Sequence, residues 1–241
     1  MKALVLAGGR GNRLNELSRE QNKCMIKIQG KHLIQYNLDH AVETGVDEIV
    51  IVVGYRADSI MGLLGDCYHG KPIRYVIQRE QNGLVHAIEC AQDAISGEDF
   101  FLMLGDEMLF RPKCHDMINK FKNDSYLFGL CGIVKARDKN QIKKTYNVIK
   151  NNNNRIFRLI EKPRRPLNHF QGTGHCVFRN DIFSYIKYTP IHHERNEKEL
   201  PDLVQCAVDD GMIVEAFFLC EKYTNINTPQ DLKMAEDFFC E

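Results

Sequence analysis

The sequence lacks three features that would each indicate a different class of protein. Its 241 residues carry 32 Lys+Arg against 32 Asp+Glu, so no net charge attracts a polyanion over long range. This balance argues against nucleic acid as the main partner. No apolar run approaches the roughly 20 residues that cross a bilayer, and the first residues run into glycines without a signal-peptide core. We therefore expect a cytoplasmic protein with no membrane partner.

The cysteines also lack an organised pattern. There are nine, with no Cys-x-x-Cys pair and no cluster with histidine. Such scattered thiols argue against a disulfide framework and against a structural zinc site. The remaining composition, with 44% hydrophobic and 27% charged residues, is typical of a soluble globular protein and excludes disorder of the chain as a whole.

The first half alternates short apolar runs with amphipathic segments, and Gly45 stands where a helix C-cap belongs. We expect strands over 2–7, 48–53, 73–77 and 100–104, and helices over 33–44, 56–65 and 84–95. Strands that alternate with helices predict a right-handed, mostly parallel α/β sheet of the Rossmann-like kind, flanked by helices.

The second half is richer in strands. We expect strands over 126–134, 146–150, 156–160, 174–178 and 213–219, and helices over 180–187, 198–210 and from 228. The four asparagines 151–154 are a polar turn and predict a hairpin. Because no linker or repeat interrupts the chain, we expect one domain over 1–241, with a nucleotide-binding half (1–110) and a β-rich half (111–241).

The strongest local signal is a glycine loop directly after the first strand. Gly8, Gly9 and Gly11 permit close backbone approach, so that successive N–H groups can face phosphate oxygens. Ligands of open α/β sheets bind at this edge. The dinucleotide fingerprint would need a glycine at Arg13, and the Gly-Lys-Ser/Thr ending of a P-loop is absent. We predict an anion cradle, with a purely structural turn as the alternative.

Six motifs occur in a fixed order along the chain. They are the glycine loop, Lys23-Cys24-Met25, 83–88 (GLVHAI), Leu104-Gly105-Asp106, Glu161-Lys162-Pro163 and 225–229 (NINTP). Over nearly its whole length the chain thereby resembles the sugar-1-phosphate nucleotidyltransferases (NDP-sugar pyrophosphorylases), in their glucose-1-phosphate thymidylyltransferase-like branch. The resemblance makes the β-rich half a sugar-binding lobe.

The resemblance implies transfer of a nucleotidyl group from a nucleoside triphosphate, with dTTP or UTP favoured, to a sugar 1-phosphate with release of pyrophosphate. Because both substrates are polyanions, catalysis needs charge neutralisation and alignment rather than a protein nucleophile. The family pattern places Arg13 on the β- and γ-phosphates, Lys23 on the α-phosphate and Lys162 on the sugar phosphate. Asn22 stands where the family usually has proline.

The cofactor implied by the resemblance is Mg²⁺. Asp106 ends an apolar strand, where a carboxylate is well placed to hold a metal ion that bridges phosphates. The second metal ligand of the family, an aspartate, aligns with Asn225. This residue supplies a neutral oxygen instead, and Asn227 is a possible substitute.

The same resemblance gives expectations for the nucleoside and the sugar. For the nucleoside we expect the backbone of Leu6, Ala7 and Gly8, with Gly9, Gly11, Gln78 and Gly83; for the sugar we expect Glu107, Asn147, Glu161 and Gly174. Glu107 and Asn147 replace the usual Asn and Gly. We therefore hypothesise a substrate other than plain glucose 1-phosphate, such as an amino or modified sugar. His86 is expected to pack rather than bind.

Three other interpretations compete. A cytidylyl- or guanylyltransferase acting on another phosphorylated small molecule would use the same phosphate residues. A catalytically weak, nucleotide-sugar-binding regulatory homologue is suggested by Asn225, although the set of Arg13, Lys23, Asp106 and Lys162 argues against it. An NAD-type oxidoreductase is disfavoured by Arg13. The resemblance also allows a homo-oligomer.

Overall fold

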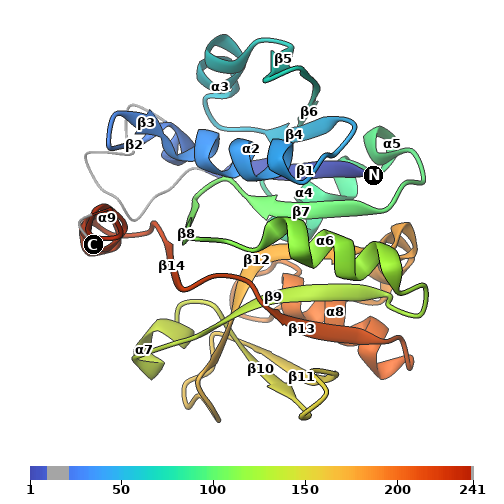
Figure 1. Cartoon of the computed structure of the whole chain (residues 1–241). Helices are drawn as coiled ribbons and strands as arrows, with labels where there is room; N and C mark the ends of the chain where they lie inside the picture. The colour runs from blue at the N-terminus through green and yellow to red at the C-terminus, as the bar shows by residue number, and fades with distance from the viewer. Residues whose placement is uncertain (10–21, 240–241) are drawn as a thin grey trace.

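A ten-stranded sheet forms the centre of the computed structural model (Figure 1), which describes residues 1–9 and 22–239. In its first half, β1 (Lys2–Ala7) lies between β4 (Ile49–Val53) and β7 (Phe100–Leu104), and β6 (Lys71–Ile77) lies beyond β4. These four strands are parallel, as predicted. All residues of β4 are buried, because helices cover both faces of the sheet.

The helices of this half lie close to their predicted positions. They are α2 (Leu33–Glu43), α3 (Ala57–Leu64), α4 (Leu84–Cys90) and α5 (Gln92–Ile95), and the short β5 (Cys67–Tyr68) pairs with β6. The single helix expected over 84–95 is divided at Ala91, whose φ and ψ are −86° and −3°. That backbone conformation lies outside the regular α-helical range and separates α4 from α5.

The second half adds antiparallel strands to β7. β12 (Phe170–Phe178) pairs with β7 and carries β9 (Gly129–Lys135), and β13 (Val214–Phe218) runs parallel to β9. The predicted hairpin is present: β10 (Tyr146–Lys150) pairs with β11 (Ile156–Glu161). Its turn is held by Asn151, whose Oδ1 accepts hydrogen bonds from two backbone N–H groups, at 2.9 Å from each.

Several elements were not expected. They include η1 (Lys23–Met25), β2 (Lys27–Ile28), β3 (Lys31–His32), α6 (Cys114–Asn123) and α7 (Lys139–Ile142). The segment Asn180–Tyr188 is a 3₁₀ helix (η2) rather than an α-helix. The helix α8 (Leu200–Asp209) lies close to the predicted range 198–210, and α9 (Pro229–Asp237) begins one residue after the predicted start at 228. The most consequential addition is the antiparallel pair of β8 (Glu107–Phe110) and β14 (Lys222–Asn225), which places Asn225 opposite Glu107.

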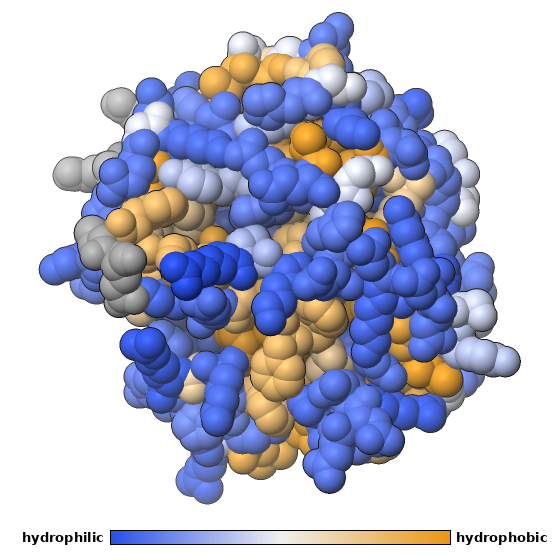
Figure 2. All heavy atoms as spheres, in the orientation of Figure 1, coloured by the Kyte–Doolittle hydropathy of each residue, from blue (hydrophilic) through white to orange (hydrophobic). Residues whose placement is uncertain are grey.

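The hydrophobic core lies on both faces of the sheet. Successive residues of β7 point to opposite faces, so that Phe100 packs with α4 and α8 while Phe101 packs with α2 and α6. Figure 2 shows that the surface formed by α2 and α6, which faces the viewer, carries mostly hydrophilic side chains. In the described ranges all eight cysteines are free thiols, and no helix is long and apolar enough to span a membrane.

Phe101→Ala is expected to destabilise the protein by about 3–5 kcal/mol, because it empties a fully buried ring position in the central strand. Urea denaturation gives the free energy of unfolding. The matched control Phe157→Ala removes a ring that is 54% exposed and should cost about 0.5 kcal/mol or less. Equal costs at the two positions would contradict the assignment of this core.

Candidate active site

Two adjoining cavities open at the carboxyl ends of the parallel strands. The larger encloses about 430 Å³ and is lined by Leu6, Ala7, Gly8, Gly9, Lys23, Gln78, Gly83 and Asp106, among others. The smaller encloses about 130 Å³ and is lined by Glu107, Glu161, Lys162 and Gly174, among others. Three side chains line both: Leu84, Leu104 and Asn225. The larger cavity is therefore named the nucleotide cavity below, and the smaller the sugar cavity, after the ligands that the sequence predicts.

The described part of the glycine loop is packed tightly at the base of the nucleotide cavity. A Cβ on Gly8 would lie 2.9 Å from Oε1 of Gln78, and one on Gly54 would lie 2.9 Å from the carbonyl oxygen of Gly8. A side chain at Gly54 would thus clash with the backbone of the loop and one at Gly8 would displace Gln78, whereas a Cβ at Gly9 would meet no atom within 4 Å. Gly11 and Arg13 belong to residues 10–21, outside the described residues, so their predicted roles stay predictions.

Asn22 explains how the chain positions Lys23 without the usual proline. Its fully buried amide donates to the carbonyl oxygens of Ala7 (2.9 Å) and Tyr55 (2.8 Å), and its Oδ1 accepts from the N–H of Cys24 at 2.8 Å. The side chain therefore fastens the start of η1 to the end of β1. Lys23 is directed into the nucleotide cavity.

Gln78 and Gly83 lie together on the opposite wall. The amide of Gln78 donates to the carbonyl oxygen of Gly83 at 3.1 Å and lies 3.1 Å from Nδ1 of His86. Gly83 has a φ of +94°, and a Cβ there would lie 2.6 Å from a carboxylate oxygen of Glu197. Only glycine fits this approach. His86 is not among the residues that line either cavity.

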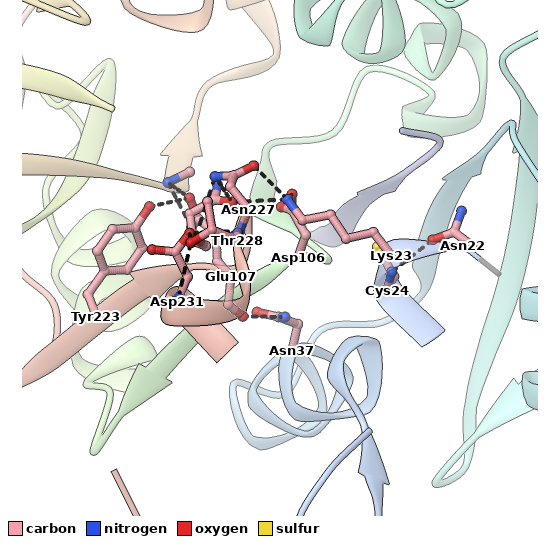
Figure 3. Close-up of polar contacts among 12 residues, drawn as sticks. Asn22, Lys23, Cys24, Asn37, Asp106, Glu107, Tyr223, Asn227, Thr228 and Asp231 are labelled. Atoms are coloured by element: carbon pink, nitrogen blue, oxygen red, sulfur yellow. Dashed lines mark hydrogen bonds and ion pairs between the residues drawn. The ribbon is translucent and has the colours of Figure 1, made fainter. Parts of the chain in front are cut away.

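Three segments that are distant in the sequence meet beside the wall that the two cavities share, and Figure 3 shows Lys23, Asp106 and Asn227 there. Nζ of Lys23 forms an ion pair with Asp106, and it donates to Oδ1 of Asn225 (3.2 Å) and to Oδ1 of Asn227 (2.9 Å). Asp106 directly precedes β8, and Asn225 is the last residue of β14. The antiparallel pairing of these two strands therefore brings the two residues together. We call Asp106, Asn225 and Asn227 the oxygen cluster.

The oxygen cluster has the chemistry that a magnesium ion requires. Mg²⁺ prefers oxygen ligands and is typically held in proteins by one or two carboxylates together with waters and substrate phosphates. One carboxylate and two amide oxygens fit this pattern. Among the described residues, no group of three His, Cys, Asp or Glu side chains could hold a metal ion, so a metal site at Asp106 depends on the asparagines.

The carboxylate of Glu107, which we predicted to bind the sugar, forms its hydrogen bonds within the protein. Its carboxylate accepts from the N–H of Gly174 at 2.9 and 3.0 Å and from the hydroxyl of Tyr223 at 2.6 Å, and it lies 3.0 Å from Nδ1 of His175. Burial and the neighbouring Glu107 charge raise the pKa of the Tyr223 hydroxyl, which keeps it a donor. These contacts use the roughly four lone-pair positions of a carboxylate.

Asn147 is also engaged within the protein. It is fully buried, its amide donates to Asn168 (2.7 Å) and to the carbonyl oxygen of Phe170 (2.8 Å), and it accepts from the N–H of Leu167 at 2.8 Å. It lines neither cavity. The two departures from the family pattern, Glu107 and Asn147, thus brace the walls of the sugar cavity.

Glu161 and Lys162 do face the sugar cavity, together with Gly174. Nζ of Lys162 lies 2.8 Å from Oε1 of Glu161, and burial raises the pKa of Glu161 to about 7. Lys162 has a φ of +40°, and its N–H donates to the carbonyl oxygen of Thr145 at 2.7 Å. This bond fixes the strained residue at the cavity.

Sequence reasoning missed a charged segment beside both cavities. Glu197 lines the nucleotide cavity and Glu199 the sugar cavity, and Arg195 forms an ion pair with Glu199. Nη2 of Arg195 is buried and, in the structure as described, has no hydrogen-bond partner. The run of charges from 194 to 199 carries no motif and is typical of a solvated surface loop, so the sequence offered no signal.

These features are those of an α/β protein that binds phosphorylated ligands at the carboxyl edge of its sheet. The nucleotidyl transferase family model matches residues 2–239, and the chain belongs to this family. It is 31% identical over 98% of its length to the UTP–glucose-1-phosphate uridylyltransferase AglF of Haloferax volcanii, of which it covers 95%.

A glucose-1-phosphate thymidylyltransferase of Streptomyces griseus is 29% identical over 90% of the chain and 59% of the relative. Among solved structures, a UDP-glucose pyrophosphorylase complexed with UDP-glucose superposes with a TM-score of 0.89 at 20% identity, covering 99% of this chain and 98% of the other. This likeness confirms the predicted fold.

Glu107→Gln should destabilise the protein by about 2–4 kcal/mol, because an amide nitrogen would replace one acceptor among buried donors. The free energy of unfolding in urea measures this cost. Glu89→Gln, at an exposed position of α4, is the matched control and should be nearly neutral. A neutral Glu107→Gln would show that its contacts do not brace the site.

Glu161→Gln should raise the free energy of unfolding relative to the wild type, and this gain should grow with pH. Because the folded protein raises the pKa of Glu161 from 4.5 to about 7, it binds this proton more tightly than the unfolded chain does. The wild type should therefore lose stability relative to the variant as the pH rises from about 4.5 to about 7, with a constant difference above. Urea denaturation across this range tests it, and parallel curves would contradict it.

Proposed function

We propose that the protein transfers a nucleotidyl group from UTP or dTTP to a sugar 1-phosphate, with Mg²⁺, and releases pyrophosphate to form an NDP-sugar. The observation that carries this proposal is the position of Lys23 and the oxygen cluster between a glycine-lined cavity and a second cavity that holds Lys162. Family membership and relatives named for UTP and thymidylyl transfer support the two nucleotides.

In this proposal the nucleotide cavity holds the triphosphate substrate. The backbone of residues 6–9 and the Gln78–Gly83 pair would contact the nucleoside, because backbone and amide groups can read a base edge without carrying charge. Lys23 would neutralise the α-phosphate, and Arg13 is assigned to the β- and γ-phosphates. Asp106 and Asn225, with Asn227 beside them, would hold Mg²⁺, which supplies charge neutralisation for the departing pyrophosphate.

The sugar cavity holds the acceptor. Lys162 would bind its phosphate, and Glu161 and the backbone at Gly174 would bind hydroxyl groups. A carboxyl group with a pKa of about 7 is protonated in a substantial fraction of molecules at neutral pH, so it can donate as well as accept a hydrogen bond. Glu107 and Asn147 would act indirectly, by fixing the backbone of the cavity.

A matrix of the four nucleoside triphosphates against glucose 1-phosphate and glucosamine 1-phosphate, read by pyrophosphate release, tests this function. Release should depend on Mg²⁺ and be fastest with UTP or dTTP. Asp106→Asn should lower the rate by about 100-fold or more, because a charged ligand is lost from the cluster. The control Asp116→Asn changes an exposed carboxylate and should leave the rate unchanged.

No pyrophosphate release with any pair would refute the proposal and favour a binding homologue. Pyrophosphate release only with CTP or GTP would contradict the choice of UTP or dTTP and would identify a cytidylyl- or guanylyltransferase.

A further inference from the structure

The ammonium group of Lys23 is fully engaged by the oxygen cluster. It has three protons to donate, and it meets one oxygen each from Asp106, Asn225 and Asn227. The side chain is only 7% exposed. Lys23 thus sits among the oxygens as a bound cation would, with Asp106 balancing its charge.

Hydrogen bonds within the protein orient the side chain of Asn227 so that its oxygen faces Lys23. The amide of Asn227 donates to Oδ1 of Asn225 at 2.8 Å, and the N–H of Asn227 donates to Asp231 at 3.1 Å. These bonds turn Oδ1 of Asn227 toward Lys23. Asn22, on the other side, fixes the backbone from which Lys23 extends.

We infer that Lys23 is the resident cation of the oxygen cluster, and that a divalent metal ion binds these oxygens only after nucleotide phosphates have drawn the lysine away. The inference rests on the proposed function, since it takes the cluster as the metal site and Lys23 as a phosphate ligand.

Electrostatics favour this exchange of partners. One carboxylate cannot balance an ammonium and a dication together, and two cations that share the same oxygens repel each other strongly where water is scarce. A triphosphate adds several negative charges beside the cluster, so that both cations can then be accommodated. The metal would accordingly be recruited together with the nucleotide, and the protein alone would bind it weakly.

Mn²⁺ binding in the absence of nucleotide, followed by electron paramagnetic resonance, tests the inference. Lys23→Met keeps the length of the side chain and removes its charge, so the variant should bind one Mn²⁺ per chain at least about 10-fold more tightly than the wild type. The gain should disappear in the double variant Lys23→Met/Asp106→Asn. Lys27→Met, at an exposed position of β2, is the matched control and should bind Mn²⁺ as the wild type does.

Lys23→Gln provides a second variant with the same expected direction, and thermal unfolding with and without Mn²⁺ shows that each variant is folded. A folded variant that gains the site should melt at a higher temperature when Mn²⁺ is added.

Equal Mn²⁺ affinity in the wild type and both Lys23 variants would overturn the inference, whether they bind the ion tightly or not at all. That result would leave the proposed function standing as long as the wild type releases pyrophosphate. A wild type without such release, combined with a gain of Mn²⁺ affinity in the variants, would instead refute the function and retain only Lys23 as the resident cation of the oxygen cluster.

Discussion

The buried carboxylate of Glu107 is the interaction on which the geometry of the site depends. The carboxylate joins β8, β12 and β14 through Gly174, His175 and Tyr223. The backbone carbonyl oxygen of Glu107 also accepts a hydrogen bond from the side-chain amide of Asn37 in α2, at 3.0 Å. A carboxylate in this setting is tolerated only because its oxygens are satisfied. Since Asp106 precedes Glu107 in the chain, and Asn225 follows Tyr223 by two residues, the same contacts fix the oxygen cluster.

This arrangement places opposite charges in fixed positions before any substrate arrives. Lys23 lies on the nucleotide side of the cluster and Lys162 on the sugar side, and each is paired with a carboxylate of the protein. Both lysines thus have a counter-charge that negatively charged phosphates would have to replace, as in the exchange proposed for Lys23.

Much of the fold followed from the sequence because its signals were local. The apolar runs at β1, β4 and β7 and the asparagine turn before β11 were confirmed. The pairing of β8 with β14 was missed because these strands are four residues each and lie more than a hundred positions apart. The contacts that hold Glu107 could not be predicted because a sequence cannot show that His175 and Tyr223 converge on it; a direct role of Glu107 toward the sugar stays a prediction. Glu197 and Glu199 were missed because their segment carries no motif, and the roles of Arg13 and Gly11 stay predictions.

The two cavities share a wall, so that a substitution in this wall changes the shape of both. Leu104 lines both cavities, and its Cγ lies 2.2 Å from the position that a Cβ on Gly174 would take. A larger side chain at position 174 would therefore overlap with Leu104 in the wall between the cavities. A substitution at position 174 would thus alter both cavities at once, whereas one at Glu199, which lines the sugar cavity but not the nucleotide cavity, would leave this shared wall unchanged.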